Sequence, residues 1–87
     1  MPNKVKKGSF WMLVCDGRIY EIKRLDKKRN MLWAQGYSRQ GTPNDHIEHA
    51  PIDEFLDIAT PCAVVKSEYF DSEGNLMYHT VEYLEVK

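Results

Sequence analysis

Asp16-Gly17 lies between two apolar segments, and this pair constrains the fold of the chain more than any other sequence feature. The segments are SFWMLV before the pair and RIYEIKRL after it. An Asp-Gly pair in this setting favours a two-residue type I′ turn, which needs positive φ at both central residues. We therefore expect an antiparallel hairpin in which Leu13 faces Tyr20 and Trp11 faces Ile22.

The first strand of this hairpin is apolar on both of its faces. Because side chains alternate along a strand, Phe10, Met12 and Val14 point away from the face that carries Trp11 and Leu13. A strand of this kind has to be covered twice, once by its own domain and once by a further element or chain. Phe10, Met12 and Val14 are therefore the predicted interface residues.

Strand and turn signals continue beyond the first hairpin. Residues 26–30 form a charged turn, and MLWAQGY, which begins at Met31, is a third short strand, so residues 9–36 are expected to form a three-stranded meander. Residues 37–50 are polar, without periodicity, and contain Gly41 and Pro43. We expect a long exposed loop there, a kind of segment that often carries function.

A short helix is predicted over residues 51–58. Proline is favoured at the first helical position, where Pro51 stands, and acidic residues such as Asp53 and Glu54 suit the first turn. Three apolar residues follow the i, i+3, i+4 spacing of one helix face, namely Ile52, Phe55 and Leu56.

The segments CAVVKSEYF and LMYHTVEYLEV, joined by the turn DSEGN, predict a C-terminal hairpin over residues 62–86. A five-residue turn aligns Phe70 with Leu76. The side chains that then share one face are Val65, Tyr69, Met77, Val81 and Tyr83, with Ser67 and His79 between them. We expect that face to supply the second cover for the first strand.

These elements predict one mostly β domain, with α+β character at the margin, that spans residues 1–87. Its length is sufficient for one modest core. The expected architecture is a five-stranded antiparallel, SH3-like, partly open barrel with one short helix. An α+β roll is the alternative, because the helix comes late for such a barrel and the last hairpin is longer than the barrel requires.

A pattern of residue types also resembles small SH3-like domains, most closely those of phage and other mobile-element proteins of unknown function. It consists of Gly8-x-x-Trp11, Asp16-Gly17-x-Ile19-Tyr20, a tight basic turn, Trp33, a polar loop and Pro51-x-x-x-Phe55. The likeness covers residues 5–60. It implies a small protein that acts by binding, including as a modulator of host machinery, and it carries over no functional residue.

Charge is divided unevenly between the halves of the chain. Residues 1–40 hold ten Lys/Arg and three Asp/Glu, a net charge of +7, whereas residues 41–87 hold two and ten, a net charge of −8. Such asymmetry is found in nucleic-acid-binding surfaces, protein-binding surfaces and self-complementary dimers, and it cancels where folding interleaves the two halves. The basic residues are concentrated in the N-terminal segment 1–7 and in residues 23–29, which include Lys27, Lys28 and Arg29.

Few residues are arranged for catalysis or metal binding. His46 and His49 have i, i+3 spacing, but Pro51 disfavours a helix through them, and no zinc pattern of ordinary spacing is present. Neither Cys15 nor Cys62 is followed by a helix start that would activate its thiol. We therefore expect no enzyme activity, no cofactor and no metal.

The sequence favours a small, non-catalytic binding or adaptor protein that acts through protein–protein contacts, with a homodimer as one form of that role. The candidate binding residues are Lys27, Lys28, Arg29, Trp33, Tyr37, His46 and His49. The alternative is a nucleic-acid-binding module that uses the basic turn, with Tyr20, Trp33 and Tyr37 as stacking faces. Because no apolar run approaches the ~20 residues of a membrane span, we expect a cytoplasmic protein without a membrane partner.

Overall fold

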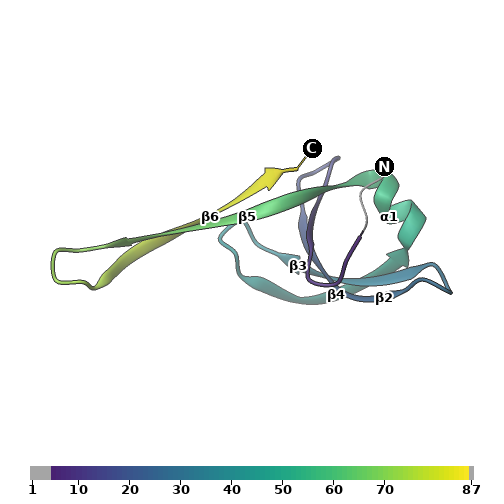
Figure 1. Ribbon diagram of the computed structural model, residues 1–87, viewed down its shortest axis with the longest axis horizontal. Coiled ribbons are helices and arrows are strands. Elements are labelled where there is room, and N and C mark those ends of the chain that lie inside the picture. The colour runs from purple at the N-terminus through teal and green to yellow at the C-terminus, as the bar shows by residue number, and fades with distance from the viewer. Residues whose placement is uncertain (1–4, 87) are drawn as a thin grey trace.

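The computed structural model describes residues 5–86, which form one curled antiparallel sheet and one helix (Figure 1). The strand order across the sheet is β4-β3-β2-β1-β5-β6. In chain order, the elements are β1 (Phe10–Leu13), β2 (Ile19–Asp26), β3 (Met31–Tyr37), β4 (Pro43–Pro51), α1 (Ile52–Ile58), β5 (Ala59–Phe70) and β6 (Leu76–Glu85).

This architecture confirms the mostly β prediction with one short helix and corrects the number of strands from five to six. The sheet curls into an antiparallel half-barrel that α1 closes at one side (Figure 1). β1 lies at its centre, between β2 and β5, so the apolar first strand is paired along both of its edges.

The first hairpin has the predicted faces but a longer turn than predicted. Trp11 pairs with Tyr20, and the Leu13 amide donates to the Arg18 carbonyl at 2.8 Å, so residues 14–17 form a four-residue loop. The Asp16 carboxylate accepts from the Arg18 amide at 3.0 Å, which places Asp16 inside the longer turn. The register shift of two residues leaves every side chain on its predicted face, because side chains alternate with a period of two.

The predicted polar loop over residues 37–50 is wrong in its larger part, because β4 occupies most of it. β4 pairs with β3, with His49 opposite Trp33 and Ile47 opposite Gln35. Only a tight turn remains between the strands, in which the Ser38 amide donates to the Thr42 carbonyl at 2.9 Å. Residues 43–49 are exposed on both faces, so this edge strand lacks the apolar alternation that marks a half-buried strand.

The main core lies between the sheet and α1. Trp11 is only 2% exposed and meets the Phe55 ring edge-on, with ring centroids 5.9 Å apart. The buried residues of this core are Val5, Trp11, Leu13, Tyr20, Ile22, Leu32, Ala34, Phe55 and Ala59, and Leu25, Ile52 and Leu56 pack against them. The predicted apolar face of the helix is therefore confirmed.

The start of α1 is fixed by the β2–β3 turn. Pro51 is extended and lies at the N-cap, so the helix begins at Ile52, one residue later than predicted. The N-cap residue makes no side-chain hydrogen bond to the helix. Asn30, with φ of 56°, supplies the missing contacts. Its carbonyl accepts from the Ile52 amide at 2.9 Å, and its side-chain amide donates to Asp53 Oδ1 at 2.8 Å. That hydrogen bond lowers the pKa of the Asp53 carboxyl.

A second, smaller packed layer lies on the other side of the sheet, under the root of the last hairpin. Phe10 contacts the rings of Tyr37 and Tyr83, at centroid distances of 5.1 and 6.2 Å, and Ile19 beside it is 3% exposed. The Tyr83 hydroxyl donates to the Ser38 carbonyl at 3.2 Å. The last hairpin therefore covers the second face of β1, as expected.

The residues that form this cover differ from those predicted. Phe70 pairs with Leu76 as predicted, but a bulge between Tyr69 and Phe70 moves the rest of the register by one residue, so that Tyr69 pairs with Tyr78. A shift of one residue moves one strand's side chains to the opposite face. Val81 and Tyr83 therefore face the body of the molecule, while Val65 and Tyr69 face the other way.

Within residues 5–86, the helix is too short and too polar to cross a membrane.

Candidate functional site

The C-terminal hairpin extends far beyond the rest of the fold. β5 and β6, which have 12 and 10 residues, are paired from Cys62–Glu85 outward to Phe70–Leu76. β1 pairs with residues 59–62 of β5, so among residues 5–86 the outer part of the hairpin has no third strand beside it. We call residues 63–84 the arm and residues 5–62 the body. The arm leaves the body as a two-stranded ribbon and gives the molecule extents of 53 × 28 × 21 Å (Figure 1).

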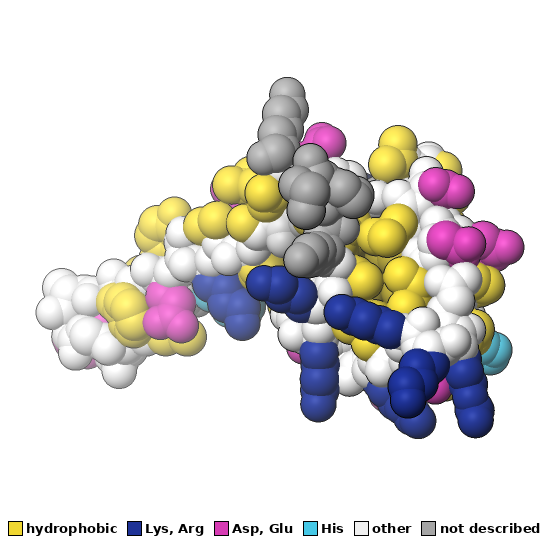
Figure 2. All heavy atoms as spheres, turned by 45° about the vertical axis from the view of Figure 1, so that its right-hand side comes forward, with side chains coloured by type: hydrophobic (Ala, Val, Ile, Leu, Met, Phe, Trp, Pro, Cys, Tyr) yellow, Lys and Arg dark blue, Asp and Glu magenta, His cyan; other side chains and the backbone are white. Residues whose placement is uncertain are grey.

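One face of the arm, which we call the open face, is almost uncharged. The β-pairing places there Ala63, Val65, Ser67 and Tyr69 from β5, and Tyr78, Thr80, Glu82 and Leu84 from β6. All except Ser67 are exposed, with 41% of Val65, 54% of Tyr78 and 49% of Leu84 accessible. Hydrophobic side chains are visible along the arm in Figure 2.

The opposite face, the closed face, is partly covered and otherwise charged. Near the body it carries Val64, Val81 and Tyr83, which are half-buried. Farther out, the same face carries Lys66, Glu68 and His79, which are exposed. The arm thus has charged residues on the outer part of the face that looks toward its own body, and mainly apolar and hydroxyl residues on the face that the described part of the body leaves exposed.

The end of the arm is rich in exposed apolar side chains. Tyr69 and Tyr78 stack with centroids 4.5 Å apart at an angle of 16°. Phe70, Leu76 and Met77 are 56%, 53% and 64% exposed. The turn beyond them is well formed, because Asp71 Oδ1 accepts from the amides of Glu73 and Asn75 at 2.9 and 2.8 Å. The apolar end is therefore held in a defined conformation.

An isolated two-stranded hairpin is at best marginally stable in water. The outer arm receives cross-strand contacts such as the tyrosine stack, but the described residues of the body do not cover its open face. Contiguous apolar patches of several hundred Å² on a monomer usually mark interaction sites. The arm is therefore the first candidate for a binding surface.

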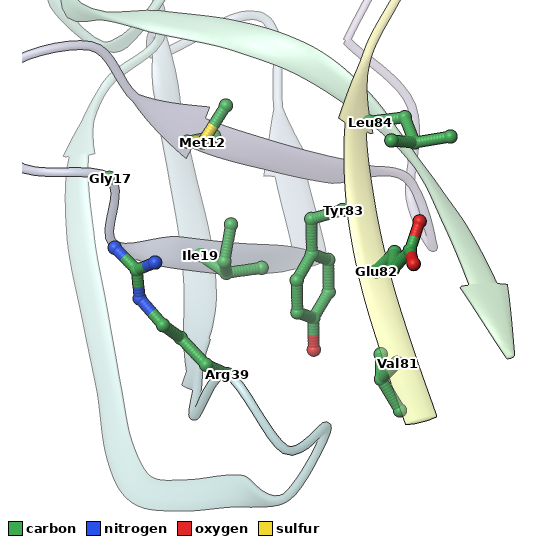
Figure 3. A pocket seen from close by; sticks show the side chains of 8 residues that line it. All are labelled: Met12, Gly17, Ile19, Arg39, Val81, Glu82, Tyr83 and Leu84. Carbon is green, nitrogen blue, oxygen red and sulfur yellow. The ribbon is translucent and has the colours of Figure 1, made fainter. Parts of the chain in front are cut away.

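A shallow cleft of about 310 Å³ lies where the arm leaves the body (Figure 3). Its floor is formed by Met12, Ile19 and Tyr83, and Arg39 reaches across its mouth toward Gly17. Arg39 comes from the β3–β4 turn, so three segments distant in sequence meet here. The cleft holds one cationic group and few directed polar groups, which does not define a catalytic site.

The predicted basic turn lies at the opposite end of the sheet from the arm root. Lys27, Lys28 and Arg29 are exposed between β2 and β3, and the Arg29 side chain makes a long contact with Asp26, 3.8 Å between Nε and Oδ2. Lys and Arg side chains gather along one side of the body in Figure 2. Of the predicted basic N-terminal segment, Lys6 and Lys7 are exposed, while residues 1–4 lie outside the described residues.

Trp33 is half-buried on the sheet face opposite the main core. Its ring carries the Arg24 guanidinium 4.6 Å from the centroid, a cation–π contact made possible by the β2 bulge that pairs Arg24 with Trp33. Tyr37 is also half-buried, and its hydroxyl donates to Glu21 Oε1 at 2.7 Å. That hydrogen bond raises the pKa of Tyr37 to about 12. Both rings are thus engaged within the fold.

The three predicted interface residues are not brought together. Phe10 and Met12 are half-buried beneath the root of the arm, where Phe10 packs against Tyr83. Val14 belongs to the four-residue turn and is 72% exposed beside Ile58, whose carbonyl accepts from the Val14 amide at 2.9 Å. The apolar second face of β1 is therefore mostly covered by this chain's own hairpin.

The two histidines do not form a joint site. His46 and His49 lie in β4, and residues three apart in an extended strand project to opposite faces. Within residues 5–86, no three His, Cys, Asp or Glu side chains lie close enough together to hold a metal ion. His49 instead lies opposite Trp33 across the strand pair.

A smaller hollow of about 170 Å³ lies beside α1, with Leu13, Leu32 and Phe55 at its apolar base. The Tyr20 hydroxyl donates to Glu48 Oε2 at 3.1 Å at its edge. Burial and this hydrogen bond raise the pKa of Tyr20.

The two cysteines lie outside this hollow. Cys15 is exposed in the first turn, and burial raises the pKa of the Cys62 thiol, which disfavours the thiolate.

Sequence reasoning missed the apolar residues of the arm as site candidates. They are Val65, Tyr69, Phe70, Leu76, Met77, Tyr78 and Leu84. The signal was the length of the last hairpin, which exceeds what a small barrel needs. A strand that runs past the edge of its sheet has to expose both faces, so its apolar residues there are surface residues.

Comparison with protein-family models, curated proteins and solved structures found no match for this chain. Inference about its function therefore rests on its own residues and geometry.

Proposed function

We propose that this chain is a non-catalytic binding protein that attaches to another protein surface through the open face and the end of its arm. The observation that carries this proposal is the exposure of the stacked pair Tyr69–Tyr78, next to Phe70, Leu76 and Met77. Aromatic residues and methionine are enriched at the centres of protein interfaces, where charged residues are depleted.

The position of these residues supports the same role. The arm holds them at a distance from the body on a ribbon whose register and turn are defined by paired strands and by Asp71. A preformed ribbon loses little conformational entropy when it binds. The raised pKa of Cys62 and the separation of His46 from His49 support a non-catalytic role.

The test is a comparison of what co-purifies with three forms of the full chain. The forms are the wild type, a variant with Tyr69→Ser and Tyr78→Ser on the open face, and a control with Lys66→Ser and His79→Ser on the closed face. We expect one protein species, whether the chain itself or another protein, to be retained by the wild type and the control and lost from the open-face variant. Equal retention by all three would overturn the proposal.

A second candidate function is nucleic-acid binding by the basic turn. It is favoured by the exposure of Lys27, Lys28 and Arg29 and by the nearby Arg24–Trp33 pair. Phosphate contacts by three such residues give affinity that falls steeply with salt. Fluorescence anisotropy with a single-stranded 20-mer at 50 mM salt tests this role. Charge reversal of the three residues should abolish binding, and binding unchanged by that reversal would exclude the turn as the site.

A further inference from the structure

We infer that the partner of the open face is a second copy of this chain, with the two arms packed face to face and running in opposite directions about a two-fold axis near the Ser67–Thr80 pair. This inference rests on the proposed function and names the partner of the same surface. It follows from the chemistry, the symmetry and the size of the open face.

The open face is chemically suited to pack on itself. Among its eight residues only Glu82 is charged, whereas the outer closed face carries Lys66, Glu68 and His79. Packing two copies of the closed face together would remove these charged side chains from water, which is costly, and the inner part of that face already packs on its own body. Two copies of the open face bring together apolar and hydroxyl side chains instead.

The order of residues along the open face is self-complementary when the ribbons run in opposite directions. Its middle is formed by the hydroxyl residues Ser67 and Thr80, which pair with each other across the two strands. With the axis at that pair, Tyr69 of one copy lies over Val65 of the other. Tyr78 of one copy likewise lies over Glu82 of the other, where its hydroxyl can donate to the carboxylate.

The single charge does not oppose this arrangement. Each Glu82 is two residues from Thr80, so the two copies of Glu82 are ~13 Å apart at ~3.3 Å per residue. That separation exceeds the Debye length of ~8–10 Å at moderate salt, so their repulsion is largely screened.

The length of the arm fits the same overlap. Ser67 lies three residues from Phe70, where the end turn begins, and five residues from Cys62, where β5 meets β1. The paired part of the arm is therefore about two residues longer on the body side of the Ser67–Thr80 pair than on the tip side. This difference leaves room for the end turn, residues 71–75, when two reversed arms overlap.

The available area predicts a weak, reversible dimer. Tyr69 and Tyr78 are each about half exposed, and an aromatic side chain offers ~200 Å². With the other open-face residues, each copy contributes roughly 400 Å², for a total of roughly 800 Å² in the dimer. This is below the ~1,200 Å² of standard specific interfaces, so we expect a dimer that dissociates on dilution.

The first test is sedimentation equilibrium of the purified full chain from ~5 to ~500 μM. We expect the mean mass to rise from the monomer toward twice that value with increasing concentration. Tyr78→Glu should remain a monomer over the whole range, whereas its sequence neighbour on the closed face, His79→Glu, adds the same charge and should dimerise like the wild type. A wild-type monomer at ~500 μM would overturn the inference, as would equal effects of the two variants.

Cross-linking then tests the geometry. In a Cys15→Ser background, Ser67→Cys should give a disulfide-linked dimer when oxidised with copper phenanthroline, because the two side chains project toward each other in the ~10 Å space between packed sheets. Glu68→Cys, on the closed face, should not. Efficient cross-linking of Glu68→Cys but not Ser67→Cys would contradict the open-face arrangement.

The two proposals fail separately. One outcome is that the purified chain stays monomeric while a different protein co-purifies with the wild type and is lost from the open-face variant. In that case the proposed dimer is wrong and the proposed binding role stands. If no species depends on the open face in either experiment, both proposals are wrong.

Discussion

The body and the arm are made of the same kinds of residue, yet only the body covers its sheet on both sides. In the body, α1 covers one face through Phe55, and the root of the last hairpin covers the other through Tyr83. In the outer part of the arm, the same two strands continue without either cover from residues 5–62, and the apolar residues of the open face are about half exposed. Cross-strand pairs alone bury little apolar surface, so we propose that a partner covers the open face of the arm.

The largest expected loss in the free energy of unfolding comes from a substitution in the body. Phe55 is 5% exposed and packs on Trp11, so Phe55→Ala should lower the free energy of unfolding by ~3–5 kcal/mol. The matched arm variant, Phe70→Ala, removes a side chain that is 56% exposed and should cost under ~1 kcal/mol in dilute monomer. Urea titration followed by tryptophan fluorescence measures both. Equal losses would mean that the arm is part of the body's cooperative unit.

The next largest loss of stability is expected at Tyr37, in the aromatic layer between the body and the root of the hairpin. Tyr37→Phe removes the hydrogen bond to Glu21 and should cost about 1.5 kcal/mol at pH 7. Because the pKa of Tyr37 is raised to about 12 from an ordinary value near 10, this stabilisation is fully present below pH ~10 and lost as pH rises through 12. The difference in urea midpoint between wild type and variant should therefore shrink from pH 10 to 12. A difference that stays constant would contradict this assignment.

Substitution of two turn glycines compares the stability of the body with that of the arm tip. Gly17 in the body and Gly74 at the arm tip have φ of 75° and 86°, so alanine is strained at both. We expect Gly17→Ala to lower the free energy of unfolding of the body by ~1 kcal/mol and Gly74→Ala to change it very little. Thermal unfolding of the dilute proteins checks this. A large loss in Gly74→Ala would show that the tip turn supports the body.

The smallest effect on stability is expected from shortening the arm. Joining Lys66 to Val81, which are paired, through Asn-Gly removes residues 67–80 and closes the ribbon with a two-residue turn. The free energy of unfolding should change by less than ~0.5 kcal/mol in dilute solution, while concentration-dependent association disappears. Denaturant titration and sedimentation on one sample measure both, and unfolding of the shortened chain would refute the division into body and arm.

The parts of the fold that follow local chemistry could be predicted from sequence. Helix 51–58, the hairpin faces around Trp11 and the Phe70–Leu76 alignment each depend on a few neighbouring residues. β4 could not, because an edge strand with two exposed faces has no apolar period. The faces of the arm could not be predicted either. One bulged residue near Tyr69 moves the side chains of one strand to the opposite face, and no pattern in LMYHTVEYLEV marks this bulge.

The same limit applies to the candidate site. Lys27, Lys28 and Arg29 were identified because charged turns are visible as residue types. The open face was not, because Val65, Tyr78 and Leu84 look like core residues until the sheet is seen to end before them. Whether an apolar strand residue is buried depends on what lies beside it, and that is a property of the topology.

Hydrogen exchange of the wild-type chain at ~5 and ~500 μM tests most directly whether the arm obtains its missing cover from a second copy. We predict that amides of residues 66–80 exchange several times more slowly at the higher concentration, because the fraction of free monomer falls by that factor for a weak dimer, while those of β1–β3 keep the same rates. Equal exchange of the arm at both concentrations would contradict the account.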